Sequence, residues 1–181
     1  MNGRKLLLAL VMAATPTAVS AQSTEVGMAS GLSVFTAEGD DLTIFGLPGD
    51  GLFLPTANVY ATFFATPQLA IEPHLGVVVV NGSGDTEWVG RLGTQLGYYF
   101  SGGEDSSPYV AANGAWIRDG DEDNSFSLGA AVGYRVLLPP GLAVRFEAGY
   151  ARWFIGGGDE FFDPVDLNQF RLGIGIGGLV N

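Results

Sequence analysis

Apolar side chains recur at every second position in eight runs of about ten residues each, and this period dominates most of the chain. A period of two is that of a β-strand whose two faces meet different surroundings. Proline falls mainly between the runs, with Pro73 as the exception inside the third run. The sequence therefore predicts an all-β, eight-stranded antiparallel chain with strands over residues 26–36, 57–66, 69–81, 87–100, 108–118, 125–138, 142–154 and 169–180.

The two faces of these runs differ in a way that decides what surrounds the protein. In the run 125–138, one face carries Phe126, Leu128 and Val132, whereas the other carries mainly glycine, alanine and serine. A soluble barrel exposes a charged face to water, but only 15% of the residues in the whole chain are charged. A transmembrane barrel instead turns its apolar face to lipid and small or polar residues to its lumen. Closure into a barrel is expected, because hydrocarbon does not tolerate an unpaired sheet edge.

Composition excludes several classes of protein. The 181 residues contain no cysteine, so disulfide scaffolds, thiolate metal sites and thiol enzymes are excluded. Nineteen acidic residues against eight Lys and Arg give a net charge of −11, which argues against a nucleic-acid partner. We expect no cofactor, because no motif in the chain indicates one.

The amino-terminal segment has the layout of a secretory signal. Arg4 and Lys5 precede an apolar core over residues 6–14, and small residues lead to Ala21. The apolar core is too short to span a bilayer as a helix, and no later stretch approaches about 18 consecutive apolar residues. We therefore expect residues 1–21 to be a signal peptide cleaved after Ala21, and residues 22–181 to form one outer-membrane β-barrel domain.

The connections between the runs alternate in length and charge. Short links such as Pro67-Gln68 and Pro139-Pro140-Gly141 alternate with connections that hold most of the acidic residues. With an even number of strands, both ends of the mature chain lie at the short-turn end of the barrel. This asymmetry is typical of short periplasmic turns opposite longer outer loops.

A weak sequence motif accompanies this pattern. It occurs as Leu92-Gly93…Gly97-Tyr98 and as Leu128-Gly129…Gly133-Tyr134. By architecture and by these motifs the chain resembles the small eight-stranded outer-membrane barrels, the class of the OmpA transmembrane domain and its OmpX-like relatives. The resemblance implies a monomer in the outer membrane of a Gram-negative-type bacterium, in contact with membrane lipid and lipopolysaccharide. One departure is the last residue, Asn181, where such barrels usually end in an aromatic residue.

Eight polar residues fall on the inward face by alternation. Because Glu72 and Glu147 oppose four arginines, the predicted lumen is net basic, and the excess charge needs water or a partner at the barrel end. Two interpretations stay open: a structural ion network that fills the barrel, or a lumen that conducts ions. The predicted lumenal residues are Glu72, His74, Arg91, Gln95, Arg135, Arg145, Glu147 and Arg171.

A single histidine and an acidic connection could indicate a catalytic site or a metal site. His74 is the only histidine, but Leu75-Gly76 follows it, so the His-x-Ser pair of barrel lipid A deacylases is absent. Residues 119–124 begin like a calcium loop, with carboxylates at Asp119, Asp121 and Asp123, but Asn124 replaces the glycine of an EF-hand. These acids are either a weak divalent-cation site or a solvated hairpin tip.

Two connections and six aromatic residues are candidates for contact with a partner or with the membrane interface. Residues 37–55 mix acids with Ile44 and Phe45, and together with residues 155–168 they are candidate surfaces for an extracellular partner. Six aromatic residues are candidates for the membrane-interface belts, namely Trp88, Trp116, Trp153, Tyr98, Tyr134 and Tyr150. The leading hypothesis is a non-enzymatic structural or surface-interaction barrel. The alternatives are a narrow porin-like channel, a lipid-modifying enzyme and a secreted soluble ligand-binding barrel.

Overall fold

The structure is a computed structural model that describes residues 24–37, 43–46, 58–81, 86–102, 106–119, 124–155 and 166–180. These residues form nine strands. Their bounds are β1 (Thr24–Ala37), β2 (Thr43–Gly46), β3 (Asn58–Phe64), β4 (Leu69–Asn81), β5 (Thr86–Tyr99), β6 (Ser107–Asp119), β7 (Asn124–Leu138), β8 (Leu142–Ile155) and β9 (Asp166–Val180). No helix long and apolar enough to cross a membrane occurs in these ranges.

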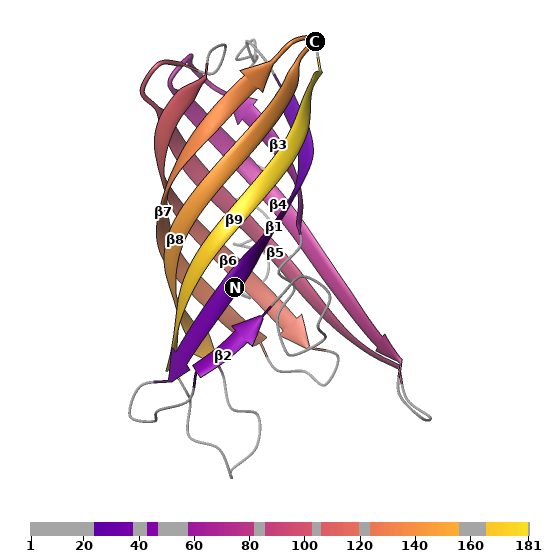
Figure 1. The fold of residues 1–181 in the computed structure, drawn as a ribbon. Helices are drawn as coiled ribbons and strands as arrows, with labels where there is room; N and C mark the ends of the chain where they lie inside the picture. Colours follow the sequence, from indigo (N-terminus) through magenta and orange to yellow (C-terminus); the bar gives the residue numbers. More distant parts are fainter. Residues whose placement is uncertain are drawn as a thin grey trace, which may run out of the picture.

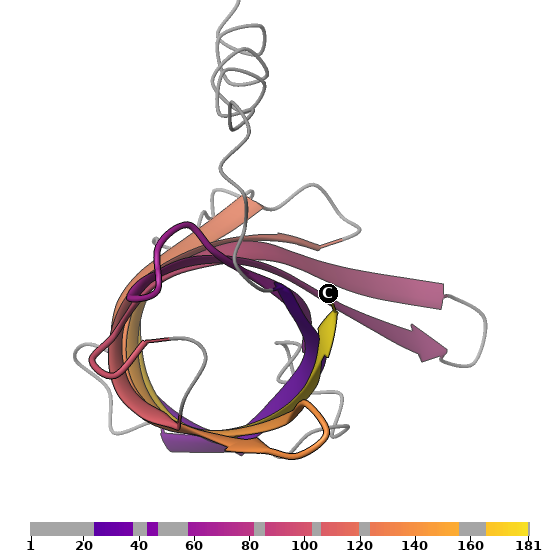
Figure 2. The ribbon, with the colours of Figure 1, turned by 90° about the horizontal axis from the view of Figure 1, so that it is seen from above.

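Eight of the nine strands close into one antiparallel barrel. Each of β3 to β9 pairs with its neighbour in the chain, β1 pairs with β3, and β9 returns to pair with β1 from Thr24↔Val180 to Ala37↔Leu167. Figure 1 shows the tilted strands of this wall, and Figure 2 shows the closed ring from above. The prediction of an eight-stranded antiparallel barrel with meander topology is therefore confirmed.

The ninth strand, β2, lies within the segment predicted as the first loop. It pairs with the distal half of β1, from Ser33↔Gly46 to Thr36↔Thr43, whereas β3 pairs only with the proximal half. Ile44 and Phe45 are thus part of a short strand and not of an irregular loop. The physical reason is that β1 is longer than β3, so β2 supplies hydrogen-bond partners for an edge that would otherwise be open. Residues 38–42 and 47–57 lie outside the described residues.

Pro73 lies in β4, where the sequence pattern was weakest. Its pairing with Thr94 of β5 is intact. On the other side, the register with β3 runs through Tyr60↔His74 and resumes at Phe63↔Ile71, so the ladder is interrupted beside Pro73. Proline lacks the backbone N–H that this ladder needs, and the interruption is therefore local to one side of β4.

The two faces of the wall are arranged as the alternation predicts. Large apolar side chains point outward, including Met28, Leu128 and Leu172 with exposed fractions of 64%, 59% and 62%. Many of the glycine, alanine and serine residues point into the lumen, together with charged residues such as Glu72, Arg135 and Arg145. This is the reverse of a soluble barrel, which buries its bulky apolar face. The outer surface is that of a barrel surrounded by lipid.

The two ends of the barrel also differ as expected. Thr24 and Val180 are paired at one end, and Leu179 N donates a hydrogen bond of 2.9 Å to Gly141 O in the β7–β8 turn at that same end. Gly141 has a φ of +112°, which is a conformation that glycine adopts without strain. The carboxyl-terminal end of the described barrel therefore lies at the end with the short turns (Figure 1).

Candidate functional site: the charged lumen

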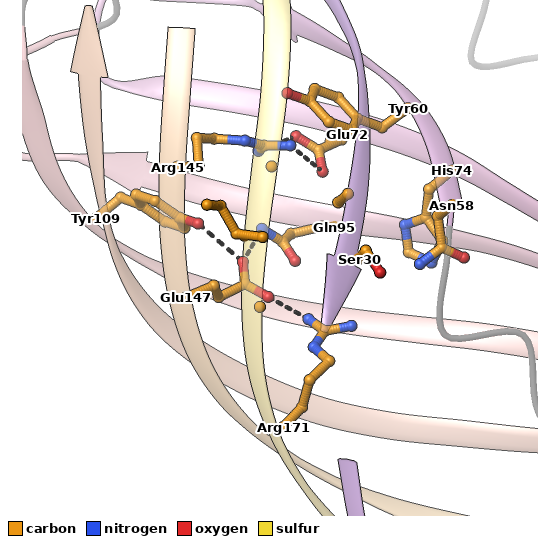
Figure 3. A pocket seen from close by; sticks show the side chains of 14 residues that line it. Ser30, Asn58, Tyr60, Glu72, His74, Gln95, Tyr109, Arg145, Glu147 and Arg171 are labelled. Carbon is orange, nitrogen blue, oxygen red and sulfur yellow. Dashed lines mark hydrogen bonds and ion pairs between the residues drawn. The ribbon is translucent and has the colours of Figure 1, made fainter. Parts of the chain in front are cut away.

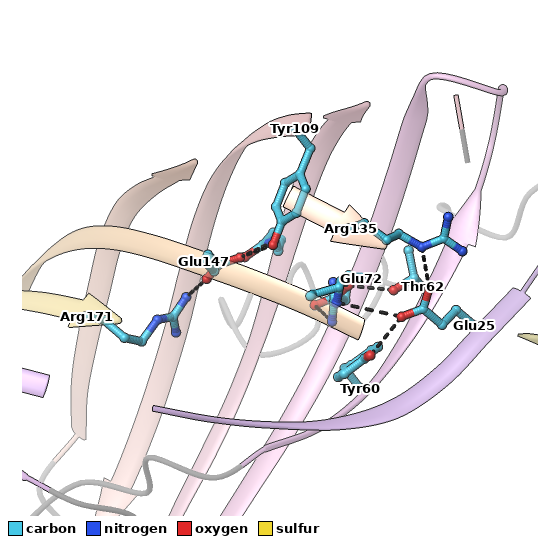
Figure 4. A network of polar contacts seen from close by, with 10 residues as sticks. Glu25, Tyr60, Thr62, Glu72, Tyr109, Arg135, Glu147 and Arg171 are labelled. Atoms are coloured by element: carbon cyan, nitrogen blue, oxygen red, sulfur yellow. Dashed lines mark hydrogen bonds and ion pairs between the residues drawn. The ribbon is translucent and has the colours of Figure 1, made fainter. Parts of the chain in front are cut away.

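The structure places all eight predicted polar residues on the lumenal side of the wall. Six are buried, with Arg135 at 0% exposure, and Glu147 and Arg171 are partly buried. The ion pairs of Arg135 and Arg145 join strands that are not neighbours in the sheet, whereas Arg171 and Glu147 lie on the adjacent strands β9 and β8. They fall into two groups that share no hydrogen bond (Figure 4).

The first group is centred on Glu25 of β1. Arg135 Nε of β7 donates to Glu25 Oε2 at 2.8 Å, and Tyr60 OH donates to Glu25 Oε1 at 2.7 Å. Arg145 Nε lies 3.6 Å from the same Glu25 Oε1. Three strands besides β1 therefore contribute groups that hold one carboxylate.

Arg145 connects Glu25 to a second carboxylate. Its Nη1 donates to Glu72 Oε2 at 2.5 Å and its Nη2 donates to Glu72 Oε1 at 3.2 Å, a bidentate pair. Thr62 Oγ1 donates to Glu72 Oε2 at 2.5 Å. The Arg145 guanidinium also lies 3.8 Å from the ring centroid of Tyr60, which adds a cation–π contact.

The second group is centred on Glu147 of β8. Glu147 Oε2 accepts hydrogen bonds from Gln95 Nε2 at 3.1 Å and from Tyr109 OH at 2.9 Å. Arg171 Nη2 pairs with Glu147 Oε1. These four side chains come from four different strands and point toward one another (Figure 3).

Aromatic side chains fill the lumen toward the short-turn end. Phe64, Tyr99 and Tyr109 are each at most 2% exposed, and their rings pack in series with centroid separations of 5.1 and 4.9 Å. Arg135 lies over the Phe64 ring at 5.5 Å. This packing and the Glu25 group occupy the same part of the lumen.

Trp153 corrects one of the sequence predictions. It was expected at the membrane interface, but its side chain is 1% exposed and packs inside the lumen against Phe35 and Ile117. Its Nε1 donates to Gln169 Oε1 at 2.8 Å, and Gln169 Nε2 donates to Ser33 Oγ at 2.8 Å. A buried indole N–H needs such an acceptor, and the lumen offers one where lipid tails would not.

The other aromatic candidates lie on the outer wall. Trp116, Tyr98, Tyr134 and Tyr150 are all exposed there. Their amphipathic rings are suited to the head-group region of a bilayer. The side chain of Trp88 lies outside the described residues.

A cavity of about 50 Å³ lies in the lumen beside His74. Ser30, Asn58 and His74 line it, and each has one buried polar atom with no hydrogen-bond partner: Ser30 Oγ, Asn58 Oδ1 and His74 Nε2. A cavity of this size and polarity has room for water. The His74 imidazole packs against Gly93 of β5, so a Cβ atom on Gly93 would collide with His74 Nε2.

The sequence reasoning did not identify Glu25 as a lumenal residue, because the first strand was predicted to begin at Val26. Glu25 shares a face with Gly27 and Ala29, so extending the alternation by one residue would have found it. It also missed Tyr60 and Tyr109, which alternation places inward but which carry no formal charge. With Glu25 included, the described lumen has three carboxylates against four arginines.

The predicted divalent-cation site at residues 119–124 lies mostly outside the described residues. Asp121 and Asp123 lie outside the described residues, and Asp119 ends β6 with its side chain outside them as well. Within the part of the chain that the structure describes, no three His, Asp or Glu side chains gather around one point as metal ligands.

Comparison with known proteins bears on the fold. No protein-family model matches the sequence, and no curated protein matches it. Among solved structures, Neisserial surface protein A (NspA) is similar, with a TM-score of 0.52 and 15% identity over 84% of this chain and 96% of that one. The outer membrane protein AlkL, solved in DMPC lipid bilayers, has a TM-score of 0.56 and 15% identity over 88% of this chain and 90% of that one.

The chain has the fold of the small outer-membrane β-barrels. The agreement covers nearly the whole length of both neighbours, and the outward apolar surface gives an independent physical reason for it. At 15% identity the likeness concerns the fold alone, so the function has to be argued from the lumen and the loops of this chain.

Proposed function

We propose that this protein is a non-enzymatic outer-membrane barrel with a structural or surface-interaction role, whose lumen is closed by its own side chains. Residues 1–21 would be removed on export, and the mature monomer would contact membrane lipid and lipopolysaccharide. The acidic loops, including residues 37–55 and 155–168, would face the medium. Divalent cations held at Asp119, Asp121 and Asp123 would bridge them to lipopolysaccharide phosphates.

The observation that carries this proposal is the filling of the lumen. Arg135, Tyr99 and Trp153 are each at most 2% exposed, although they come from three different strands. Two successive barriers therefore cross the lumen, one at Phe64, Tyr99 and Arg135 and one at Trp153 with Gln169. An eight-stranded barrel is just wide enough for side chains to fill it, and paired ions are the form in which charges can be buried there.

Conductance in a planar lipid bilayer tests the proposal. We expect no resolved current steps from the wild-type protein, provided that the same sample migrates differently before and after boiling on a detergent gel. A comparison variant, Arg135→Ser with Trp153→Ser, removes a large side chain from each barrier and should conduct if it keeps this heat-dependent shift. Defined current steps from the folded wild type would contradict a closed lumen.

The narrow porin-like channel is the second candidate, and the central cavity favours it. Unpartnered polar atoms of Ser30, Asn58 and His74 face a space of about 50 Å³ between the two barriers, as a hydrated segment of a pore would. If the wild type conducts, Trp153→Ser alone should raise the conductance. Trp116→Ser, on the lipid-facing side, should leave it unchanged.

A further inference from the structure

We propose that the lumen binds one small monovalent inorganic anion, of the size of chloride, between Arg91 and Arg171. This proposal goes beyond the structural role proposed above. It concerns a ligand held inside the barrel and is independent of the loops that would meet an external partner.

The charges of the described lumen leave one arginine without a carboxylate. Arg135 pairs with Glu25, Arg145 with Glu72 and Arg171 with Glu147. Among the described residues, Arg91 takes part in no ion pair or hydrogen bond, and its only polar contact is with the Trp153 ring at 5.5 Å. The described part of the lumen therefore holds one guanidinium that has no ion-pair partner within it.

Arg91 is too deeply buried for bulk water to solvate it. Its side chain is 5% exposed, and its buried Nε has no hydrogen-bond partner. Burial of a charge without an ion-pair partner is unfavourable, and the cation–π contact with Trp153 offsets only part of that cost. A bound counter-ion would remove most of this cost.

A small cavity lies where such an ion would have to sit. It has a volume of about 10 Å³ and is lined by Arg91 and Arg171, together with Asn113 and Gln169. No carboxylate lines it. Gln169, which bonds to Trp153 and Ser33, is an uncharged amide, so it does not neutralise either arginine.

The size and charge of this cavity select the ligand. The cavity has room for about one water-sized sphere, so a halide ion is the anion nearest to it in size, and a phosphate or a carboxylate is larger. Two guanidinium groups make the potential there positive, so an anion is favoured over a water molecule. Arg171 keeps its bond to Glu147 and lines the same cavity.

The dependence of stability on chloride tests the site. The protein is folded in non-ionic detergent in sodium chloride or in sodium gluconate at equal ionic strength, because gluconate is too large for the cavity and equal screening removes non-specific salt effects. An ion that binds only the folded state raises the unfolding temperature with its concentration. We expect the wild type to unfold several degrees higher in chloride than in gluconate.

Two substitutions separate the site from general charge effects. Arg91→Gln should abolish the difference between chloride and gluconate. Arg118→Gln removes the same charge from an exposed position on β6 and should keep the difference. Should Arg91→Gln fail to fold, Arg91→Met replaces it, because its apolar side chain fills a similar volume and creates no unpaired polar group.

Bromide gives a direct readout. Crystals grown in bromide at the concentration that saturates the stability effect should show an anomalous peak between the two guanidinium groups, and the Arg91→Gln protein should lack it. Equal unfolding temperatures in chloride and gluconate would overturn the proposal, as would a chloride effect that survives in Arg91→Gln. A peak that appears only at molar bromide would mark an adventitious ion and would also overturn it.

Discussion

Glu25 and Arg135 are 110 residues apart in the sequence, yet their side chains form an ion pair of 2.8 Å in which both partners are almost completely buried. The pair links β1 to β7 across the lumen. It therefore reports on barrel closure directly, because neither residue has this partner until β1 and β9 have joined.

Removal of the Glu25 carboxylate should destabilise the barrel strongly. Glu25→Gln removes a buried carboxylate that accepts from Arg135 and Tyr60 and lies 3.6 Å from Arg145, which is expected to cost about 3–5 kcal/mol of unfolding free energy. The double variant Glu25→Leu with Arg135→Met removes both charges and should recover most of the loss. Urea unfolding of protein folded into lipid vesicles measures both, and a double variant no more stable than Glu25→Gln would contradict the explanation by burial of charge.

Substitution of Gly93 should disturb His74. A Cβ atom at Gly93 would collide with the His74 imidazole and approach Gly114 O at 2.8 Å, so Gly93→Ala should cost about 1–3 kcal/mol. Gly114→Ala is the matched control, since a Cβ there would meet nothing closer than 3.4 Å. Unfolding midpoints of the two variants provide the comparison. Equal stabilities would show that His74 does not occupy the space over Gly93.

A charged side chain on the outer wall should reduce the folding free energy more when it lies deeper in the bilayer. Leu172 lies in the middle of β9 and Val180 lies at its end, and both are exposed outward. Leu172→Arg should cost about 2–4 kcal/mol, whereas Val180→Arg should cost about 0–1 kcal/mol. The measurement is the folding free energy in lipid vesicles. A soluble barrel would tolerate both substitutions, so an absence of any cost at Leu172 would argue against a lipid-facing surface.

The positions of Trp116 and Trp153 can be distinguished by fluorescence. Trp116 is outside the wall at 44% exposure and Trp153 is in the lumen at 1%. In variants that retain one tryptophan each, with the other two replaced by phenylalanine, acyl chains carrying bromine should quench Trp116 strongly and Trp153 weakly. Similar quenching of the two would place Trp153 at the membrane interface, where it was first a candidate.

Much of the fold follows from the sequence by itself. The period of two assigns each residue to one side of the wall without reference to any other strand, because adjacent side chains of a strand point to opposite faces. That local rule is sufficient for the number of strands, the apolar outer surface and the inward direction of residues such as Arg145 and Glu147. Glu25 was missed because the first strand was predicted to begin one residue later. Trp153 was assigned to the interface by its residue type, although alternation with Arg145 and Glu147 places it inward.

The contacts inside the lumen were decided only by the tertiary structure. Alternation shows that Arg135, Arg145 and Arg171 point inward, but not which carboxylate each one reaches. That depends on the register of eight strands, on the closure of β9 against β1, and on how far each side chain extends across the lumen. Arg91 shares its inward direction with the other three arginines, and only the closed barrel leaves it without a carboxylate, because burial and pairing arise between strands that are far apart in the sequence.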